Sequence, residues 1–141
     1  MNLSIEAVNH MDDVDGVLII PFYNNNYVMS YNSKENAWQF PTGLKDDNES
    51  IKECIQRLSL KEIGGIIGFV DPIGYYKDKN TVEEYKYGIY IVDIEDFTTK
   101  PKWSETDVVK IFDRIPPELI EDMLIYNIIL NSLKFIIKEQ N

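Results

Sequence analysis

The chain of 141 residues has very few of the side chains that carry thiol and imidazole chemistry. It contains one cysteine, Cys54, and one histidine, His10. A single cysteine excludes an intramolecular disulfide, and a single histidine argues against a histidine-based catalytic centre or a zinc site. Cys54 lies among apolar positions of a predicted helix, where we expect it to be a small buried hydrophobe.

Long apolar runs and an excess of positive charge are also missing. No apolar run is long enough to span a bilayer, and the first residues have neither the basic nor the apolar region of a secretory signal. We therefore expect a cytoplasmic protein without a membrane partner. With 14 Lys and Arg against 24 Asp and Glu, the net charge of −10 argues against nucleic acid as a partner. It leaves room for a small phosphorylated ligand that a few local cations hold.

The composition is that of one globular domain over residues 1–141, because 44% of the residues are hydrophobic. Short apolar or alternating segments, separated by turn residues, predict strands. These segments are residues 17–22, 27–32, 37–41, 66–76, 82–94 and 107–112. Their order around the predicted helices indicates the α/β class, with a mixed sheet flanked by helices on both faces.

Two segments predict helices. In residues 48–63 the apolar side chains recur at spacings of three and four, at Ile51, Cys54, Ile55 and Leu58. Asn48 is the predicted N-cap of this helix, and Gly64 follows its end. A longer helix begins near Glu118 and is apolar nearly all round. That helix either contributes to a homodimer interface or lies wholly in the core of one chain.

Residues 38–65 contain a spaced set of polar residues and glycines: Gly43, Glu49, Arg57, Glu62 and Gly64. The spacing resembles the Nudix box, whose pattern is Gly, five residues, Glu, seven residues, Arg-Glu-aliphatic, one residue, Glu-Glu, one residue, Gly-aliphatic. Residues 38–41 (WQFP) resemble its aromatic and proline lead-in, and residues 104–120 resemble the last strand and closing helix. The chain is therefore similar to MutT-like Nudix hydrolases from about Val17 onward, which implies an α/β/α sandwich.

The box departs from the family pattern at Leu58, Ser59, Lys61 and Gly65, and Thr42 replaces a glycine before it. The resemblance implies that carboxylates at positions 58, 61 and 62 hold Mg²⁺ or Mn²⁺ against a substrate pyrophosphate. Here only Glu62 remains as a metal ligand. Leu58 offers no lone pair, and Lys61 repels a cation. The three catalytic positions are therefore Glu62, Lys61 and Leu58, the last two of them degenerate. We expect the protein to bind a nucleoside di- or triphosphate-type ligand with weak or no hydrolysis, with no metal or with a weakly held one.

Glu49, Arg57 and Gly64 match structural positions of the box. By resemblance, Glu49 and Arg57 pair and brace the loop against the helix. From the residues alone, Glu49, Glu53, Arg57 and Lys61 follow at intervals of four, which is typical of an ordinary ladder of surface ion pairs. Both interpretations remain open at this point.

The remaining candidates contact the ligand or replace the missing acids. The predicted ligand-binding residues are Phe40, Thr42, Gly43, Tyr87, Glu84 and Glu105, with Tyr75 and Trp103 as further aromatic candidates. Glu53, Glu83, Glu84 and Glu105 are the candidate substitute acids. With them, the alternative function is an active Mg²⁺-dependent hydrolase of substrates linked to a nucleoside diphosphate. The third alternative is an interaction or structural protein on the same fold.

Overall fold

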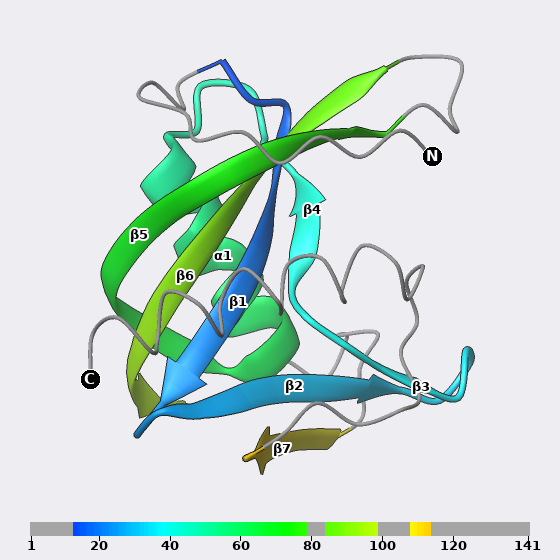
Figure 1. Cartoon of the computed structure of the whole chain (residues 1–141), viewed down its shortest axis with the longest axis vertical. Helices are drawn as coiled ribbons and strands as arrows, with labels where there is room; N and C mark the ends of the chain where they lie inside the picture. The colour runs from blue at the N-terminus through cyan, green and yellow to red at the C-terminus, as the bar shows by residue number, and fades with distance from the viewer. Residues whose placement is uncertain (1–12, 79–83, 99–107, 114–141) are drawn as a thin grey trace.

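The computed structural model describes residues 13–78, 84–98 and 108–113 (Figure 1). Its elements are β1 (Gly16–Tyr23), β2 (Asn26–Asn32), β3 (Ala37–Gln39), β4 (Thr42–Leu44), α1 (Ile51–Ile63), β5 (Gly65–Asp78), β6 (Tyr85–Phe97) and β7 (Val108–Phe112). Each predicted strand is present, and the short strand β4 was not predicted. The predicted C-terminal helix, and with it the predicted dimer surface, lies outside the described residues.

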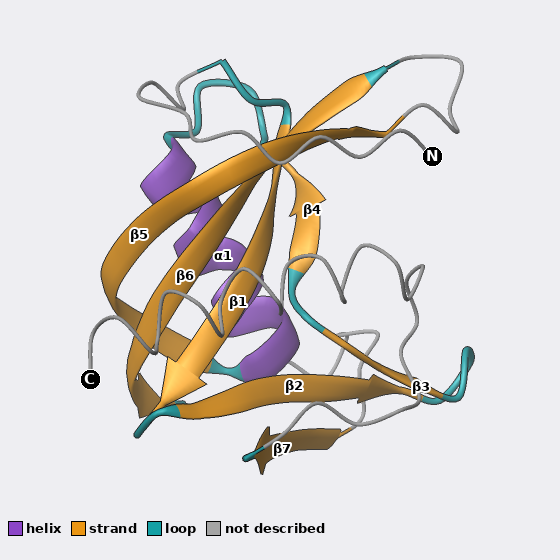
Figure 2. Cartoon of the chain, viewed as in Figure 1, coloured by secondary structure: helices purple, strands orange, loops and turns teal. Residues whose placement is uncertain are grey.

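The strands form one mixed sheet. Its order is β3-β2-β1-β6-β5, with β4 paired to β1 and β7 paired to β2. β1 and β6 run parallel, and the other pairs are antiparallel. The prediction of a mixed sheet is therefore confirmed. Figure 2 shows α1 lying across one face of the β1, β6 and β5 strands.

Both faces of this sheet are buried. On the face toward α1, the core contains Val17, Ile19, Val28, Cys54, Ile55, Leu58, Ile63, Tyr90, Val92 and Ile94. On the other face it contains Leu18, Ile20, Phe22, Met29, Phe40, Tyr76 and Ile89. Alternate residues of β1 and β6 enter opposite cores, as the twofold period of a strand requires. Burial on both faces is what an α/β/α sandwich needs, which confirms the predicted fold class.

The start of α1 differs from the prediction. Ser50, not Asn48, is the N-cap, and it forms a capping box with Glu53. The Ser50 hydroxyl accepts a hydrogen bond from the Glu53 N–H at 3.1 Å, and Glu53 accepts one from the Ser50 N–H at 3.0 Å. Asn48 has a φ of 64° and lies in the loop before the helix. A capping box satisfies two free N–H groups at once, so it prevails over a single Asn cap. Gly64 ends the helix as predicted, with a φ of 63°.

One side chain of α1 attaches the helix to strand β5. The Gln56 amide nitrogen donates to the Gly65 carbonyl at 3.0 Å, and its oxygen accepts from the Ile67 N–H at 3.1 Å. Gln56 thus makes hydrogen bonds to two backbone groups of β5, as a neighbouring strand would. This contact fixes the middle of α1 relative to β5. Among the described helices, none is long and apolar enough to cross a membrane.

Candidate functional site

Glu62 joins the C-terminal half of α1 to the segment that enters β4. Its Oε2 accepts a hydrogen bond from the Thr42 N–H at 3.0 Å, and its Oε1 accepts one from the Gln39 amide at 3.4 Å. Glu62 is only 9% exposed. The Thr42 hydroxyl in turn donates to the Val17 carbonyl at 2.9 Å, which ties the same segment to β1. Both oxygens of the one carboxylate that remains at the three metal positions of the box are thus engaged with donors of the chain itself.

Leu58 belongs to the core, not to the surface of the site. It is 4% exposed and packs in the core between α1 and the sheet. A Cβ atom at Gly43 would lie 3.0 Å from Leu58 Cδ2, so the leucine side chain occupies the space beside this glycine. Position 58 is therefore apolar and closed, and it offers no oxygen to a cation.

Among the described residues, the side chains at the three metal positions of the box do not fit a divalent metal ion. Lys61 lies in the last turn of α1, where the helix dipole favours its positive charge, and it directly precedes Glu62. Mg²⁺ needs several oxygen ligands, of which carboxylates supply the charge. Within residues 13–78, 84–98 and 108–113, no group of three or more His, Cys, Asp or Glu side chains could hold a metal. The family's metal chemistry thus lacks its ligands in the described part of the chain.

Arg57 holds the loop that precedes α1. Its Nε donates to Glu49 Oε2 at 2.7 Å, and its Nη2 donates to Glu49 Oε1 and to the Leu44 carbonyl, both at 3.0 Å. Asp46 Oδ2 lies 3.3 Å from Arg57 Nε. Glu53 is engaged in the capping box, and Arg57 reaches back to Glu49. Arg57 and Glu49 therefore form a clamp that joins the loop to the helix. Glu49, Glu53 and Arg57 do not pair successively as a ladder of ion pairs at intervals of four residues would.

The pairing of Arg57 with Glu49 and the burial of Cys54 shift the pKa values of these three residues. The hydrogen bonds from the Arg57 guanidinium hold the pKa of Glu49 at about 2, well below its usual 4.5. The pKa of Arg57 is raised in turn, first by its hydrogen bond to Glu49. Burial raises the pKa of the Cys54 thiol to about 11, so this cysteine is an unreactive thiol at neutral pH.

Replacing Glu49 with glutamine should change how stability depends on pH. Because the pKa of Glu49 is lower in the folded protein, its pairing with Arg57 stabilises fully above pH 4.5 and is lost as the pH falls toward 2. We expect Glu49→Gln to lower the free energy of unfolding by about 1–3 kcal/mol at pH 7. The difference from the native protein should shrink steadily below pH 4.5. Urea unfolding at several pH values measures it, and an equal difference at pH 3 and pH 7 would contradict the assignment.

The predicted ligand-binding residues of the described chain differ in their surroundings. Phe40 is fully buried in the core on the face away from α1, so it presents no ring face to a ligand. Thr42 and Gly43 lie on β4, beside Glu62 and Leu58. The half-buried ring of Tyr87 stacks on that of Tyr76, with centroids 5.3 Å apart.

Of the other candidates, Glu84 and Tyr75 belong to the described residues. Glu84 is exposed at the start of β6. The Tyr75 ring has the Lys86 ammonium 4.2 Å from its centre. Glu83, Trp103 and Glu105 lie outside the described residues. Gln39 was not among the predicted site residues, although it lies in residues 38–41, the aromatic and proline lead-in of the box. No local pattern marks an amide that will meet a carboxylate on a distant helix.

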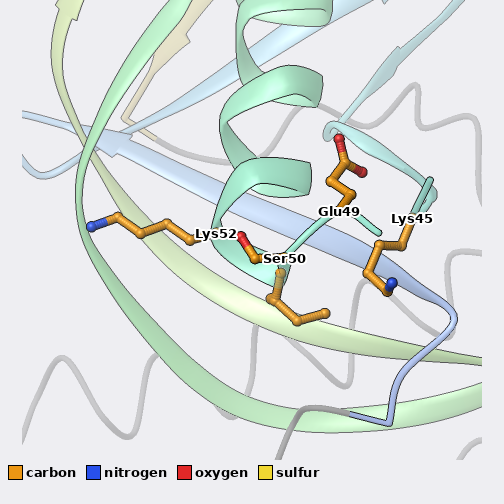
Figure 3. Close-up of a pocket in the computed structure, with 5 residues that line it drawn as sticks. Lys45, Glu49, Ser50 and Lys52 are labelled. Carbon is orange, nitrogen blue, oxygen red and sulfur yellow. The ribbon is translucent and has the colours of Figure 1, made fainter. Parts of the chain in front are cut away.

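A shallow hollow lies at the N-terminal end of α1. It is lined by Lys45, Glu49, Ser50, Ile51 and Lys52 (Figure 3). The Lys45 and Lys52 side chains lie on opposite sides of Ser50, and Lys52 points away from it. The Ser50 hydroxyl already accepts from the first turn of the helix. The two cations therefore do not converge on one anion, and the hollow is not a phosphate site by these contacts.

The mixed sheet, the Arg57–Glu49 pair and the cores on both faces agree with the Nudix fold that the sequence predicts. Solved structures confirm this. The Bacillus subtilis pyrophosphohydrolase BsRppH superposes with a TM-score of 0.78 at 21% identity, over 94% of this chain and 89% of that chain. The NUDIX domain of Shewanella oneidensis NrtR, complexed with ADP ribose, has a TM-score of 0.61 at 12% identity, over 84% and 86%.

An ADP-ribose pyrophosphatase from Streptococcus suis has a TM-score of 0.53 at 16% identity, over 74% of this chain and 78% of that chain. No protein-family profile and no curated protein sequence matches the chain. At these identities the similarity establishes the fold, and the chain has the fold of the Nudix hydrolases.

Proposed function

We propose that this protein binds a small phosphorylated ligand of the nucleotide type and hydrolyses it weakly or not at all. The observation that carries the proposal is the state of the two box positions 58 and 62. Leu58 is buried against Gly43, and Glu62 accepts hydrogen bonds from Thr42 and Gln39. Neither side chain is arranged to assemble a metal and a water for hydrolysis.

Two observations support a nucleotide-type ligand. Structures with this fold include one complexed with ADP ribose and one named as an ADP-ribose pyrophosphatase. Lys61 places a positive charge where the family pattern has a carboxylate, and an ammonium can hold a phosphate as a point charge. Such a ligand would be held locally, because the net charge of −10 repels anions at long range.

The hydrolase alternative needs substitute acids close to Glu62. Glu53 lies at the opposite end of α1, about 13 Å along the axis at 1.5 Å per residue, and it belongs to the capping box. Glu84 is exposed and directly precedes β6. Mg²⁺ or Mn²⁺ is a cofactor only under this alternative. The third alternative, an interaction protein on this fold, requires no ligand.

The test is a pair of assays on the same ligand panel. Thermal unfolding in EDTA, with ADP-ribose, nucleoside triphosphates and dinucleoside polyphosphates, should show a raised Tm for one class. A ligand at about 100 times its Kd stabilises by about 2.7 kcal/mol. Lys61→Met, which keeps the length of the side chain without its charge, should reduce the shift. Phosphate release with Mg²⁺ or Mn²⁺ should stay at background.

The contrary outcomes separate the alternatives. Metal-dependent turnover that disappears in Glu62→Gln would establish the hydrolase and overturn the binding proposal. Neither turnover nor a Tm shift over the panel would favour the interaction protein. The predicted homodimer and cytoplasmic location remain proposals beside this one. Size-exclusion chromatography with light scattering measures the first.

A further inference from the structure

Buried polar side chains of the described chain are concentrated at one place. The five are Ser30, Asn32, Gln39, Ser59 and Glu62. They come from β2, β3 and the C-terminal half of α1. Ser30 lies directly opposite Gln39 in the sheet, and the Gln39 amide donates to Glu62 on the helix. These five residues, here called the polar cluster, therefore lie between the sheet and α1.

Three members of the polar cluster are connected by hydrogen bonds. The Asn32 amide donates to Gln39 Oε1 at 3.5 Å, and the Gln39 amide donates to Glu62 Oε1 at 3.4 Å. Both bonds are long compared with the usual 2.9–3.0 Å of N–H···O bonds. The cluster is thus only partly satisfied by its own side chains.

The other two members have no protein partner. The hydroxyls of Ser30 and Ser59 are buried, and neither has a hydrogen-bond partner among the protein atoms. Both residues are 0% exposed. A buried hydroxyl without a partner loses its hydration and gains nothing in return, which is why native proteins rarely contain one. Two such groups in one small region need a common explanation.

Each of the two serines is a neighbour of one partner of the hydrogen bond between Gln39 and Glu62. Ser30 shares a strand face with Val28, which packs in the core toward α1. Ser59 lies three residues before Glu62, so the two side chains are neighbours on the buried side of the helix. Ser30 is opposite Gln39, and Gln39 bonds Glu62. Ser30 is thus a neighbour of Gln39 on the sheet, and Ser59 is a neighbour of Glu62 on the helix.

We propose that the polar cluster binds an ordered internal water, held by the hydroxyls of Ser30 and Ser59. Internal waters sit on buried polar groups that the protein leaves unpaired, and each makes about three hydrogen bonds. The two hydroxyls supply two partners, and the neighbouring Gln39 and Glu62 supply acceptor capacity for the third. Ser59 stands where the Nudix pattern has an aliphatic residue, so its smaller side chain leaves volume at this point. The site is independent of any phosphorylated ligand.

Alanine substitutions test the proposal through the sign of their effect. If a water joins the serines, Ser59→Ala and Ser30→Ala each remove one of its partners. Each should lower the Tm by about 3–6 °C. Without a water, Ser59→Ala deletes an unpaired hydroxyl and introduces the best helix former, so its Tm should rise. Ser33→Ala, at an exposed serine of the turn after β2, is the matched control and should leave the Tm unchanged.

The double variant and a direct observation complete the test. Ser30→Ala with Ser59→Ala should unfold no lower than either single variant, because a water that has lost both partners is simply released. A high-resolution crystal structure should show a water within hydrogen-bond distance of both serine Oγ atoms. Unchanged or raised Tm values for the single variants would overturn the proposal. So would a Ser59 hydroxyl bonded to a carbonyl of α1 with no water beside it.

Discussion

Restoring the family's glutamate at position 58 should strongly destabilise the protein and not rebuild a metal site. Leu58 is 4% exposed and fills the space beside Gly43, so Leu58→Glu would place a carboxylate in an apolar core with no partner. An uncompensated buried charge costs about 3–5 kcal/mol, and the lost packing of the leucine adds to this. The expected loss is a large part of the stability of a small domain.

Urea unfolding of Leu58→Glu and of the matched variant Leu58→Met measures this effect. Methionine keeps the volume and the apolar character, so it should cost less than about 1.5 kcal/mol. Leu58→Glu combined with Lys61→Glu should show no specific Mn²⁺ binding by calorimetry. A folded double variant that binds Mn²⁺ would mean that the Glu62 carboxylate leaves Thr42 for a cation.

Removing the guanidinium of Arg57 should release the loop before α1. Arg57→Ala deletes the bonds to Glu49 and to the Leu44 carbonyl, and it leaves the Glu49 carboxylate, with a side chain 12% exposed, without its main partner. Charge-assisted bonds of this kind are about twice as strong as neutral ones. We expect a loss of about 2–4 kcal/mol. Arg57→Lys should recover little, because a point charge cannot reproduce the planar contact with two groups.

Hydrogen exchange distinguishes a released loop from general destabilisation. Amides of residues 45–50 should lose protection in Arg57→Ala before those of β1 and β6 do. Lys52→Ala, at an exposed position of the same helix, is the control and should change neither stability nor exchange. Uniform loss of protection throughout the sheet would show that Arg57 stabilises the fold as a whole and is not a specific loop clamp.

Local patterns were enough to predict most of the fold. The alternation in residues 82–94 placed Tyr87, Ile89 and Ile91 on one face, and all three pack in the same core. The start of α1 was misplaced although its signal was present, because Ser50 and Glu53 have the spacing of a capping box. Strand β4 was missed because three residues carry too little pattern and pair only with the distant β1.

The sequence by itself determined which chemical groups the box contains. A leucine, a lysine and one glutamate stand at the three acidic positions, and this alone argues against the family's metal chemistry. Only the tertiary structure decided where these groups point. A glutamate on a helix can face solvent, a ligand or its own chain. The approach of Gln39 and Thr42, which lie 23 and 20 residues earlier in the sequence, supplied the donors that turn Glu62 inward. Such contacts depend on how the sheet and the helix pack, because no local period encodes which donors will meet a carboxylate.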